Sequence, residues 1–579
     1  MFRFFIAALL LAPFLALGGC ATEVVAHSDC RDGGASHCAD RRAHHTNTPT
    51  AALATPDAFS ADVVETILAS GGNAIDAAVA AALVLAVTYP EAGNIGGGGF
   101  MLIHHDGQQY FLDYREVAPN AASRDMYLDD NGDVIKDLSL VGHRAAGVPG
   151  TVAGLWAAHQ RFGSLPWAEL VAPAIALAGN GQKMPAHLAA RIAESVEDFR
   201  GKTNFSNYFA GARAGEPFTQ PELAATLRRV AQQGHDGFYK GRTAQLIAAD
   251  MASNGGLITA GDLGDYRAVW REPLRASWRD MTIISAPPPS SGGFAVIQLL
   301  KMKEHLREAF SGLGHNSAQY VHLVAEMEKR VFADRAVYFG DPDFVDVPVE
   351  KLIDPDYIAR RADEVNPVSI SSLESTRPGL EGRHTTHFSI VDFDGNAVSN
   401  TYTLNTWFGS GAVVAGAGFL LNNEMDDFSA KPGAKNFYGV VGGDANAIVP
   451  RKRMLSSMSP TLLLRGDNVD MVVGTPGGST IFTSVFQTIV NILDFDMSPA
   501  QAVAVPRFHH QLLPPDEVTF SPSAPLPHAT QDALSARGYN VKPHPWEFGD
   551  VQVVWRNGDH FESGSDPRGR GVSRSIEPL

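Results

Sequence analysis

The most informative part of this sequence is His384-Thr385-Thr386-His387-Phe388-Ser389, which is followed by a series of polar blocks. These blocks are Thr403-Leu404-Asn405, Asn422-Asn423-Glu424-Met425-Asp426-Asp427, Ser456-Ser457-Met458-Ser459-Pro460-Thr461 and Gly474-Thr475-Pro476-Gly477-Gly478-Ser479. Hydroxyls, amides, carboxylates and a pair of glycines thus fall within about a hundred residues. Such an inventory suits acyl transfer, which needs a nucleophile and donors that stabilise an oxyanion.

Thr385 has the properties of a nucleophile that the chain could activate by cleaving itself. A threonine hydroxyl reacts poorly until a base removes its proton, and an N-terminal threonine carries a base in its own α-amine. The pKa of that amine, about 7.7–8.0, suits proton transfer near neutral pH. Attack of the Thr385 hydroxyl on the His384 carbonyl would give an ester, and hydrolysis of this ester would free the amine. One nucleophile would then serve both maturation and turnover.

The composition describes a large globular protein with a net negative charge. The chain has 579 residues, 45% of them apolar, and a formal net charge of -17. This length can bury a large core and allows roughly two to four domains or one intertwined domain. Nucleic-acid binding needs clustered Lys and Arg, so the charge argues against a nucleic-acid partner.

The N-terminus resembles the export signal of a bacterial lipoprotein. A short apolar run follows Arg3 and ends in Leu17-Gly18-Gly19-Cys20. This lipobox-like ending implies cleavage before Cys20 and lipidation of its thiol, and Ala21 in the next position favours the outer membrane. An uncleaved anchor or a plain secretory signal is the alternative. In each case we expect the body of the protein outside the cytoplasm, in the periplasm.

Residues 20–49 show no apolar periodicity and are predicted to be a linker. Cys30 and Cys38 lie in this linker, and a small disulfide between them is compatible with an oxidising compartment. Nearby histidines leave metal binding as an alternative, but a solvated tether is the preferred interpretation. Folded sequence is predicted to begin near Thr50.

The apolar pattern predicts helices in the first part of the chain and strands in the last. Residues 60–69 and 73–87 are predicted helices, and the second is a core helix too short to span a bilayer. Residues 148–351 are mostly helical in pattern, with a turn-rich break at 287–293. After residue 384 short alternating strands prevail, for example 387–393 and 397–403 around the Asp394-Gly395 turn.

Other motifs in the chain do not indicate a cofactor or a metal. No Lys-Ser or Lys-Thr follows the four glycines at 96–99, so close backbone packing is preferred to phosphate binding. The chain lacks a Gly-x-Ser-x-Gly elbow and a His-Glu-x-x-His helix. The pairs His104-His105 and His509-His510 would point to opposite faces of a strand, so neither is a natural chelate. We therefore predict no cofactor and no metal.

Over roughly residues 50–579 the chain resembles the γ-glutamyltransferase (γ-glutamyltranspeptidase) family of N-terminal nucleophile hydrolases. The polar blocks occur in the order and spacing of that family, and the upstream stretches 93–100 and 113–116 also fit. The resemblance implies an α+β fold, an αββα four-layer sandwich formed jointly by two autoprocessed subunits. A signal peptide (1–19) and the linker (20–49) would precede a large subunit (50–384) and a small catalytic subunit (385–579), associated as a heterodimer.

The resemblance also implies catalytic roles. Thr385 would be the nucleophile, released by cleavage after His384, and Thr403 would be the neighbouring hydroxyl that orients it. The backbone N–H groups of Gly477 and Gly478 would form the oxyanion hole, in which one donor is typically worth about 3 kcal/mol. Taken singly, two strand threonines and a Pro-Gly-Gly turn are ordinary structural features, and only the flanking blocks favour a site.

A γ-glutamyl group presents one free α-carboxylate and one free α-ammonium. Its pocket needs a forked cation and hydroxyls for the first group, and acidic or amide oxygens for the second. By resemblance, Arg115, Ser456 and Ser457 would bind the carboxylate, and Asn405, Glu424 and Asp427 would bind the ammonium. Taken singly, Arg115 would be a surface ion-pair partner, and Glu424 and Asp427 would form a solvated acidic turn. The occurrence of all three together favours a substrate-binding site. Some relatives carry Gln where Glu424 stands.

Residues 432–443 resemble the lid loop of many bacterial members of the family, with Tyr438 closing over the bound glutamyl group. Relatives that process glutaryl cephalosporins tend to lack this loop or the acidic ammonium-binding position. Its presence therefore favours γ-glutamyl substrates, and a flexible surface loop is the alternative.

The sequence thus predicts a lipid-anchored γ-glutamyltransferase and glutathione hydrolase. Its partners would be glutathione and other γ-glutamyl compounds, with water or an amino acid or peptide amine as the acceptor; the sequence does not choose between these acceptors. A glutaryl or other N-acyl amidase on the same fold is one alternative. An uncleaved lipoprotein that binds γ-glutamyl compounds is another.

Overall fold

Two strands, β9 (Thr385–Val391) and β10 (Ala397–Thr403), form an antiparallel hairpin that begins with Thr385. Gly395 in the connecting turn has a positive φ of 81°, which a glycine adopts without strain. The hairpin confirms the predicted turn, although its first strand begins two residues earlier than the apolar pattern indicated. The computed structural model describes residues 50–372, 385–431 and 443–578, which belong to one compact unit, Thr48–Leu579.

The hairpin lies in the middle of a seven-stranded sheet with the order β18-β1-β9-β10-β2-β3-β6. The other strands of this sheet are β1 (Ala51–Thr55), β2 (Gly98–His105), β3 (Gln108–Asp113), β6 (Val269–Arg271) and β18 (Val572–Ile576). β1 comes from the start of the folded sequence and β18 from its end, and they pair antiparallel. Segments from both predicted subunits therefore contribute strands to one sheet.

A second sheet has six strands in the order β17-β16-β12-β11-β8-β7. Its strands are β7 (Leu274–Trp278), β8 (Met281–Ser285), β11 (Thr461–Arg465), β12 (Asn468–Gly474), β16 (Gln552–Asn557) and β17 (His560–Ser565). β7 and β8 fall in residues 148–351, where the pattern predicted mostly helix, so that prediction was incomplete. A five-residue apolar run such as β8 cannot be told from a buried helix segment by periodicity.

The two sheets stack face to face, and alternate residues of each strand point into different apolar layers. Phe100 and Leu102 on β2 belong to the cluster between the sheets, together with Val472 on β12. Met101 and Ile103, the alternate residues of β2, belong to the cluster on the outer face of the first sheet. This period of two is what a strand buried on both faces requires.

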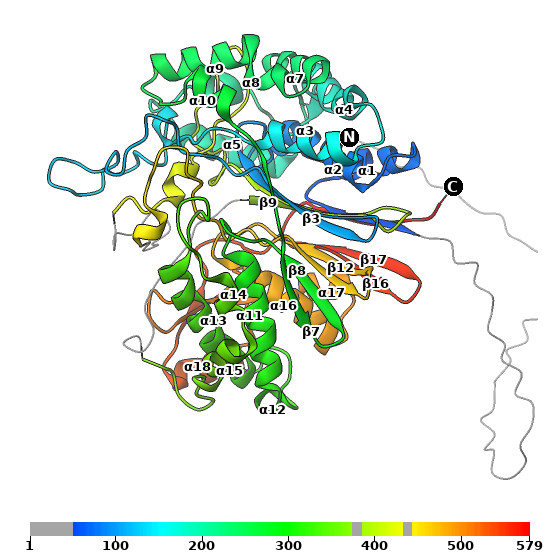
Figure 1. Cartoon of the computed structure of the whole chain (residues 1–579), viewed down its shortest axis with the longest axis vertical. Coiled ribbons are helices and arrows are strands. Elements are labelled where there is room, and N and C mark those ends of the chain that lie inside the picture. Colours follow the sequence, from blue (N-terminus) through cyan, green and yellow to red (C-terminus); the bar gives the residue numbers. More distant parts are fainter. Residues whose placement is uncertain (1–49, 373–384, 432–442, 579) are drawn as a thin grey trace, which may run out of the picture. The chain divides into compact units, whose positions relative to one another are not determined.

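Helices cover the outer face of each sheet (Figure 1). The first sheet is covered by α1 (Ala58–Ala69), α2 (Ala74–Thr88), α3 (Thr151–Phe162), α4 (Trp167–Asn180), α7 (Pro221–Gln233), α8 (Asp236–Tyr239), α9 (Gly241–Ser253) and α10 (Ala260–Asp265). The second is covered by α11 (Gly292–His305), α13 (Ala318–Tyr338), α14 (Val349–Leu352), α15 (Pro355–Asp363), α16 (Thr480–Asp494), α17 (Pro499–Ala504) and α18 (His528–Arg537). These four layers confirm the predicted αββα sandwich.

The predicted core helix is α2, which is buried along its whole length. Asn73 caps it by accepting bonds from the N–H groups of Ile75 and Asp76, and the Asp76 carboxylate accepts one from Asn73 N–H. Such a capping box satisfies the N–H groups that a helix leaves unpaired at its start. α2 packs on β9 and β10, and Tyr402 on β10 donates to the Ala82 carbonyl at 3.0 Å.

Several smaller elements lie outside the four layers. α5 (Ala186–Asp198) and α6 (Phe205–Phe209) pack in their own apolar cluster with Leu404 and Phe408, which follow β10. The others are β4 (Gln182–Lys183), β5 (Pro217–Phe218), α12 (Arg307–Phe310), β13 (Phe508–His510), β14 (Glu517–Phe520) and β15 (Asn540–Pro543). In the described part of the chain, no helix is both long and apolar enough to cross a membrane.

Candidate active site

Thr385 and Thr403 lie directly opposite one another, as the last register pair of the β9–β10 hairpin. Both side chains are buried. The Asn405 N–H donates to Thr403 Oγ at 2.7 Å. A hydroxyl that accepts a bond can still donate its own hydrogen, so Thr403 can orient a neighbouring oxygen.

The glycine run at 96–99 allows β2 to approach β10 closely. A Cβ on Gly97 would lie 2.0 Å from the Thr403 carbonyl oxygen, and a Cβ on Gly99 would lie 2.4 Å from the Tyr402 side chain. No larger residue fits there without moving the strand that carries Thr403. The run thus has the close-packing role that the sequence interpretation preferred.

A small cavity of about 20 Å³ gathers most of the predicted site residues. Its walls are Arg115, Thr385, Thr403, Asn405, Glu424, Asp427, Ser456, Ser457 and Gly478, with Met458 and Ile481. Gly477 instead lines a larger neighbouring cavity, which Thr385 also lines. Tyr438, His384 and Cys20 lie outside the described residues. The catalytic and binding roles of all the predicted site residues remain predictions. The tertiary structure nevertheless brings most of the described site residues together around one cavity.

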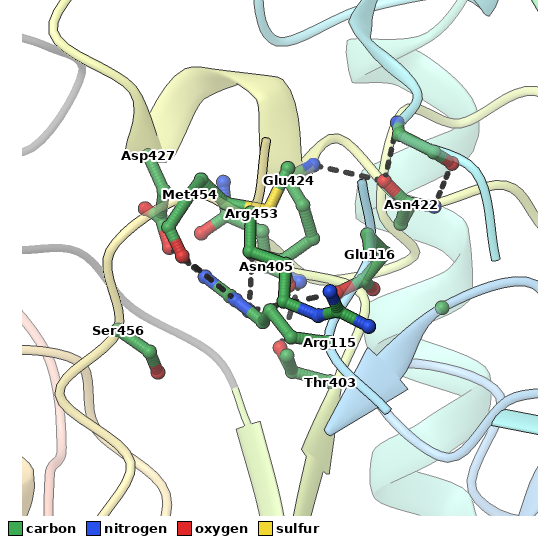
Figure 2. Close-up of polar contacts among 12 residues, drawn as sticks. Arg115, Glu116, Thr403, Asn405, Asn422, Glu424, Asp427, Arg453, Met454 and Ser456 are labelled. Atoms are coloured by element: carbon green, nitrogen blue, oxygen red, sulfur yellow. Dashed lines mark hydrogen bonds and ion pairs between the residues drawn. The ribbon is translucent and has the colours of Figure 1, made fainter. Parts of the chain in front are cut away.

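Arg115 is the centre of a buried ionic cluster (Figure 2). Its guanidinium lies 2.7 Å from Glu424 Oε2 and 2.5 Å from Asp427 Oδ2, and it also faces the carbonyls of Met454 and Leu455. The side chain of Arg115 is only 1% exposed, so neither a surface ion pair nor a solvated acidic turn describes this group. The predicted carboxylate-binding cation and the predicted ammonium-binding acids therefore neutralise each other here.

Glu116 also belongs to this cluster, although the sequence pattern assigned it no role. Its carboxylate is fully buried, lies 3.7 Å from Arg115, and has no hydrogen bond among the described residues. Gly98 and Gly147 provide its space, because a Cβ on either would lie within 3.0 Å of the Glu116 side chain. The sequence alone did not indicate its burial, because a glutamate next to an arginine is usually exposed to solvent.

Burial changes the ionisation of the whole cluster. It raises the pKa of Glu116 to about 8, and it raises the pKa values of Glu424 and Asp427 above their usual range, although Arg115 opposes each shift. Burial also opposes the charge of Arg115, yet its three carboxylate neighbours hold its pKa above the ordinary value. Burial therefore disfavours the charged form of each acid, and a bound cation would favour that form.

Ser456 and Ser457 line the same pocket as this cluster, just before β11. The Ser456 hydroxyl accepts from the Met458 N–H at 3.1 Å. The Ser457 hydroxyl is buried and has no hydrogen-bond partner among the described residues. A buried hydroxyl without a partner is unfavourable, so its position in the cavity wall suits a ligand acceptor.

The tertiary structure shows what positions these serines. The break at 287–293 runs alongside them: the Ser291 N–H and Oγ both donate to the Ser456 carbonyl, at 2.8 and 2.9 Å. Arg335 on α13 donates from Nε to Ser291 Oγ at 2.9 Å. Burial lowers the pKa of Arg335 to about 9, while Asp427 opposes the shift. Sequence reasoning treated this break only as a turn, although its two hydroxyls were the available signal.

Gly477 and Gly478 immediately precede α16. Their φ values of 137° and 58° lie in the region that favours glycine, which explains these residues. Among the hydrogen bonds of the described residues, none is donated by the N–H of Gly477 or Gly478. Two such N–H groups at the start of a helix, beside Thr385, can stabilise an oxyanion.

His509 and His510, one of the two histidine pairs, make hydrogen bonds with nearby side chains and backbone. His509 bonds to Thr483 and Gln511, and His510 bonds to the Glu517 carbonyl. Within residues 50–372, 385–431 and 443–578, no group of three or more His, Cys, Asp or Glu side chains is placed to hold a metal ion.

The αββα sandwich, with a threonine as the first residue of a central strand beside two glycine N–H groups, defines the class of N-terminal nucleophile hydrolases. Residues 60–576 match the family described as Gamma-glutamyltranspeptidase. The chain belongs to this family.

Two curated relatives show how close the similarity is. A "Glutathione hydrolase proenzyme" of Pseudomonas aeruginosa is 59% identical over 527 residues, which cover 91% of this chain and 95% of the relative. An "Acylase ACY 1 proenzyme" of Pseudomonas sp. strain SE83 is 36% identical, covering 86% of this chain and 88% of the relative.

Solved structures share the fold. The cephalosporin acylase from Bacillus halodurans superposes with a TM-score of 0.79 at 26% identity, covering 94% of this chain and 98% of its own. A chain of the gamma-glutamyltranspeptidase from Pseudomonas nitroreducens complexed with L-DON is 58% identical, with a TM-score of 0.55, covering 56% of this chain and 96% of its own.

Proposed function

We propose that this chain is the precursor of a glutathione hydrolase and γ-glutamyltransferase, which cleaves itself between His384 and Thr385. The observation that carries this proposal is the single pocket that joins the hydroxyl of Thr385, the Gly478 backbone and the Arg115 cluster. The pocket therefore contains a nucleophile, a donor for the oxyanion and charged groups that can bind a zwitterionic substrate. The similarity to a glutathione hydrolase proenzyme supports it.

Maturation uses the hydroxyl of Thr385. Its oxygen bonds to the carbonyl carbon of His384, the C–N bond breaks, and the nitrogen of Thr385 takes the proton. Water then hydrolyses the ester, leaving a carboxylate on His384 and a free amine and hydroxyl on Thr385. The two subunits stay associated because β1 from the large one and β9 from the small one pair within a sheet.

In turnover the α-amine of Thr385 takes the hydroxyl proton, and the oxygen attacks the γ-carbonyl of the substrate. The N–H groups of Gly477 and Gly478 stabilise the oxyanion, and Thr403 orients the nucleophile. When the C–N bond breaks, the proton passes from the α-amine to the leaving amine. Water or an acceptor amine then attacks the γ-glutamyl ester and restores the hydroxyl.

Selectivity follows from an exchange of ion pairs. The α-carboxylate of the substrate replaces a carboxylate at Arg115 and receives the Ser457 hydroxyl, while its α-ammonium pairs with Glu424 and Asp427. A glutaryl group brings the carboxylate without the ammonium, so it would add negative charge to a site that already holds three carboxyl groups. The correct zwitterion brings one charge of each sign, so its binding adds no net charge to the site.

The first experiment is a denaturing gel of the purified protein, with sequencing of the N-terminus of any smaller fragment. We expect a fragment that begins Thr-Thr-His-Phe-Ser. A chain that stays intact and turns over no γ-glutamyl amide would instead indicate a binding lipoprotein, and the mechanism would have to be withdrawn.

A glutaryl or other N-acyl amidase is the second candidate function. It is favoured by the 36% identity to an acylase proenzyme. Matched γ-glutamyl and glutaryl anilides separate the two candidates, because they differ only in the α-ammonium. We expect cleavage of the γ-glutamyl compound, and preference for the glutaryl compound would reverse the assignment.

We further propose that the protein is a lipoprotein, anchored in the outer membrane by a lipid on Cys20 and facing the periplasm. The lipobox-like sequence Leu17-Gly18-Gly19-Cys20 supports this. Membrane fractionation of the wild type against Cys20→Ser tests it: only the wild type should sediment with outer membranes. Recovery of both in the soluble periplasmic fraction would contradict the anchor.

The proposed γ-glutamyl activity includes a role for Tyr438, as the residue that closes over the bound glutamyl group. Replacing it with Ala should raise KM for γ-glutamyl substrates, and Tyr438→Phe should show whether the hydroxyl is needed. An unchanged KM in both variants would remove this role.

A further inference from the structure

Asp113 is a fully buried residue at the end of β3, two positions before Arg115. Its carboxylate Oδ1 accepts the Arg115 N–H at 3.0 Å. The carbonyl of Arg115 accepts from the hydroxyl of Tyr266 at 2.8 Å. Side chains therefore hold both backbone groups of Arg115, and they leave its guanidinium free to line the small pocket.

The same carboxylate contacts the segment that leads to the serine pair. Arg453 Nε lies 3.2 Å from Asp113 Oδ1. Ser456 and Ser457 follow three and four residues after this arginine, and both line the pocket. The two carbonyls between Arg453 and the serines face the guanidinium of Arg115. One carboxylate thus contacts both segments that carry the predicted carboxylate-binding residues.

The backbone pairing between these two segments is short. Val117 and Arg453 form an isolated bridge. Among the hydrogen bonds of the described residues, no backbone–backbone bond joins residues 113–116 to residues 453–457. Contacts made by side chains therefore contribute to the distance between Arg115 and the serine pair.

Asp113 is itself held firmly by a second arginine. Arg271 on β6 donates from Nε to Asp113 Oδ2 at 2.7 Å, and its Nη2 lies 2.8 Å from Asp343. Asp341 accepts the Arg453 N–H at 2.7 Å. Burial opposes the charge of Arg453, yet Asp113 and the other neighbours hold its pKa above the ordinary value. These ion pairs lie mostly out of water, so they are strong enough to fix geometry.

We propose that Asp113 is a positioning residue for recognition of the α-carboxylate of the γ-glutamyl group. It does not line the pocket, and both of its oxygens have partners within the protein. It therefore acts through Arg115 and, by way of Arg453, through the serine pair. Its role is to set the distance between the cation and the hydroxyls that receive the carboxylate. This inference rests on the proposed function, and it names a residue that determines selectivity for that substrate group.

A defect at Asp113 should appear in binding and not in the chemical step. Thr385, Thr403 and Gly478 belong to β9, β10 and the turn before α16, and none of them bonds to Asp113 in the described structure. Self-cleavage involves no α-carboxylate, so it should not depend on this residue. Loss of an interaction that is equal in the ground state and the transition state raises KM and leaves kcat unchanged.

The test is Asp113→Asn, which keeps the shape of the side chain and removes its charge. Glutathione and a γ-glutamyl anilide serve as donors, because they share the γ-glutamyl group and differ in the leaving amine. We expect KM for both to rise by the same factor, about tenfold to a hundredfold, the range for loss of a charge-assisted hydrogen bond. The kcat should stay within about twofold, and the processed fraction on a gel should equal that of the wild type.

Arg453→Met is a second variant, which carries the test if Asp113→Asn does not fold. It should raise KM for both donors in the same way, and Arg453→Lys should recover part of the loss. The double variant of Asp113→Asn and Arg453→Met should have a KM close to that of the worse single variant, because both changes break one contact. Full additivity of the two effects would show that Asp113 does not act through Arg453.

Glu326→Gln is the matched control, because Glu326 is also a buried carboxylate, lies 3.0 Å from Arg330, and does not line the pocket. Its KM should equal that of the wild type. An unchanged KM in Asp113→Asn, or a loss of kcat and of processing together with the rise in KM, would overturn the inference while the wild type still cleaves the anilide. A wild type that cleaves neither donor would overturn the proposed function, and the inference with it.

Discussion

Thr385 and Thr403 face each other across the open end of one hairpin, and the Thr403 hydroxyl already accepts a bond from the Asn405 N–H. The Thr403 hydroxyl can still donate its own hydrogen to a neighbouring oxygen. The pairing depends on the hairpin register, since a slip of one residue would turn one of the two side chains to the opposite face.

Thr403→Val removes the hydroxyl but keeps the shape of the side chain, so it should slow both self-cleavage and turnover by about tenfold to a hundredfold. Loss of one hydrogen bond to a reacting oxygen has this size. Thr403→Ser keeps the hydroxyl and should retain most activity. Gel densitometry of the processed fraction and kcat/KM for a γ-glutamyl anilide measure the two effects, and equal behaviour of Val and Ser would disprove the role.

Ser457→Ala should affect binding and stability in opposite directions. The hydroxyl is buried without a partner in the described structure, so its removal should leave thermal stability unchanged or slightly higher. The KM for γ-glutamyl donors should rise about tenfold, because the substrate carboxylate loses a donor. A variant that melts earlier with an unchanged KM would show that the hydroxyl supports the fold instead.

Ser291→Ala tests whether the 287–293 break positions Ser456. The variant loses the bonds from Arg335 and to the Ser456 carbonyl, while the bond from the Ser291 N–H remains. We expect a KM several-fold higher with kcat nearly unchanged, and partial rescue by Ser291→Thr. If Ser291 has only a structural role, the variant should lose stability without a selective rise in KM. Ser253→Ala is the control, because the exposed Ser253 hydroxyl bonds only within its own helix.

Acid should destabilise the fold through three buried histidines. Burial lowers the pKa of His387 to about 3 and those of His509 and His510 to about 4. Because these folded values lie below the unfolded value of about 6.5, the unfolded chain binds protons first as the pH falls. Their stabilising contribution is complete above pH 6.5 and decreases toward pH 4, by about 1.4 kcal/mol per pH unit for each histidine.

His509→Gln should therefore lose less stability than the wild type between pH 7 and pH 5, by roughly 2 kcal/mol. Denaturant midpoints at the two pH values provide the measurement. His560→Gln, which changes an exposed histidine, is the control and should behave like the wild type. Equal acid sensitivity in all three proteins would assign the destabilisation to other groups.

Local sequence determined much of this protein. The turn at Asp394-Gly395, the alternating strands on either side of it and the capped apolar helix α2 all depend on residues close together in the chain. The ordered polar blocks were enough to predict the αββα fold and to select the residues that line the small pocket. These signals are local in the chain, or they belong to a family pattern.

Tertiary structure alone decided the rest, because it depends on contacts between distant residues. Arg115 and Asp427 lie 312 positions apart in the chain, and their contact exists only in the folded protein. This contact makes Arg115 and Glu116, two adjacent charged residues, part of one buried ionic cluster. The strands β7 and β8 became visible only as members of the second sheet, where β8 pairs with the distant strand β11. Likewise, nothing in the sequence of α5 indicated that this helix would pack with Leu404 and Phe408, because these residues follow β10 and lie far from α5 in the chain.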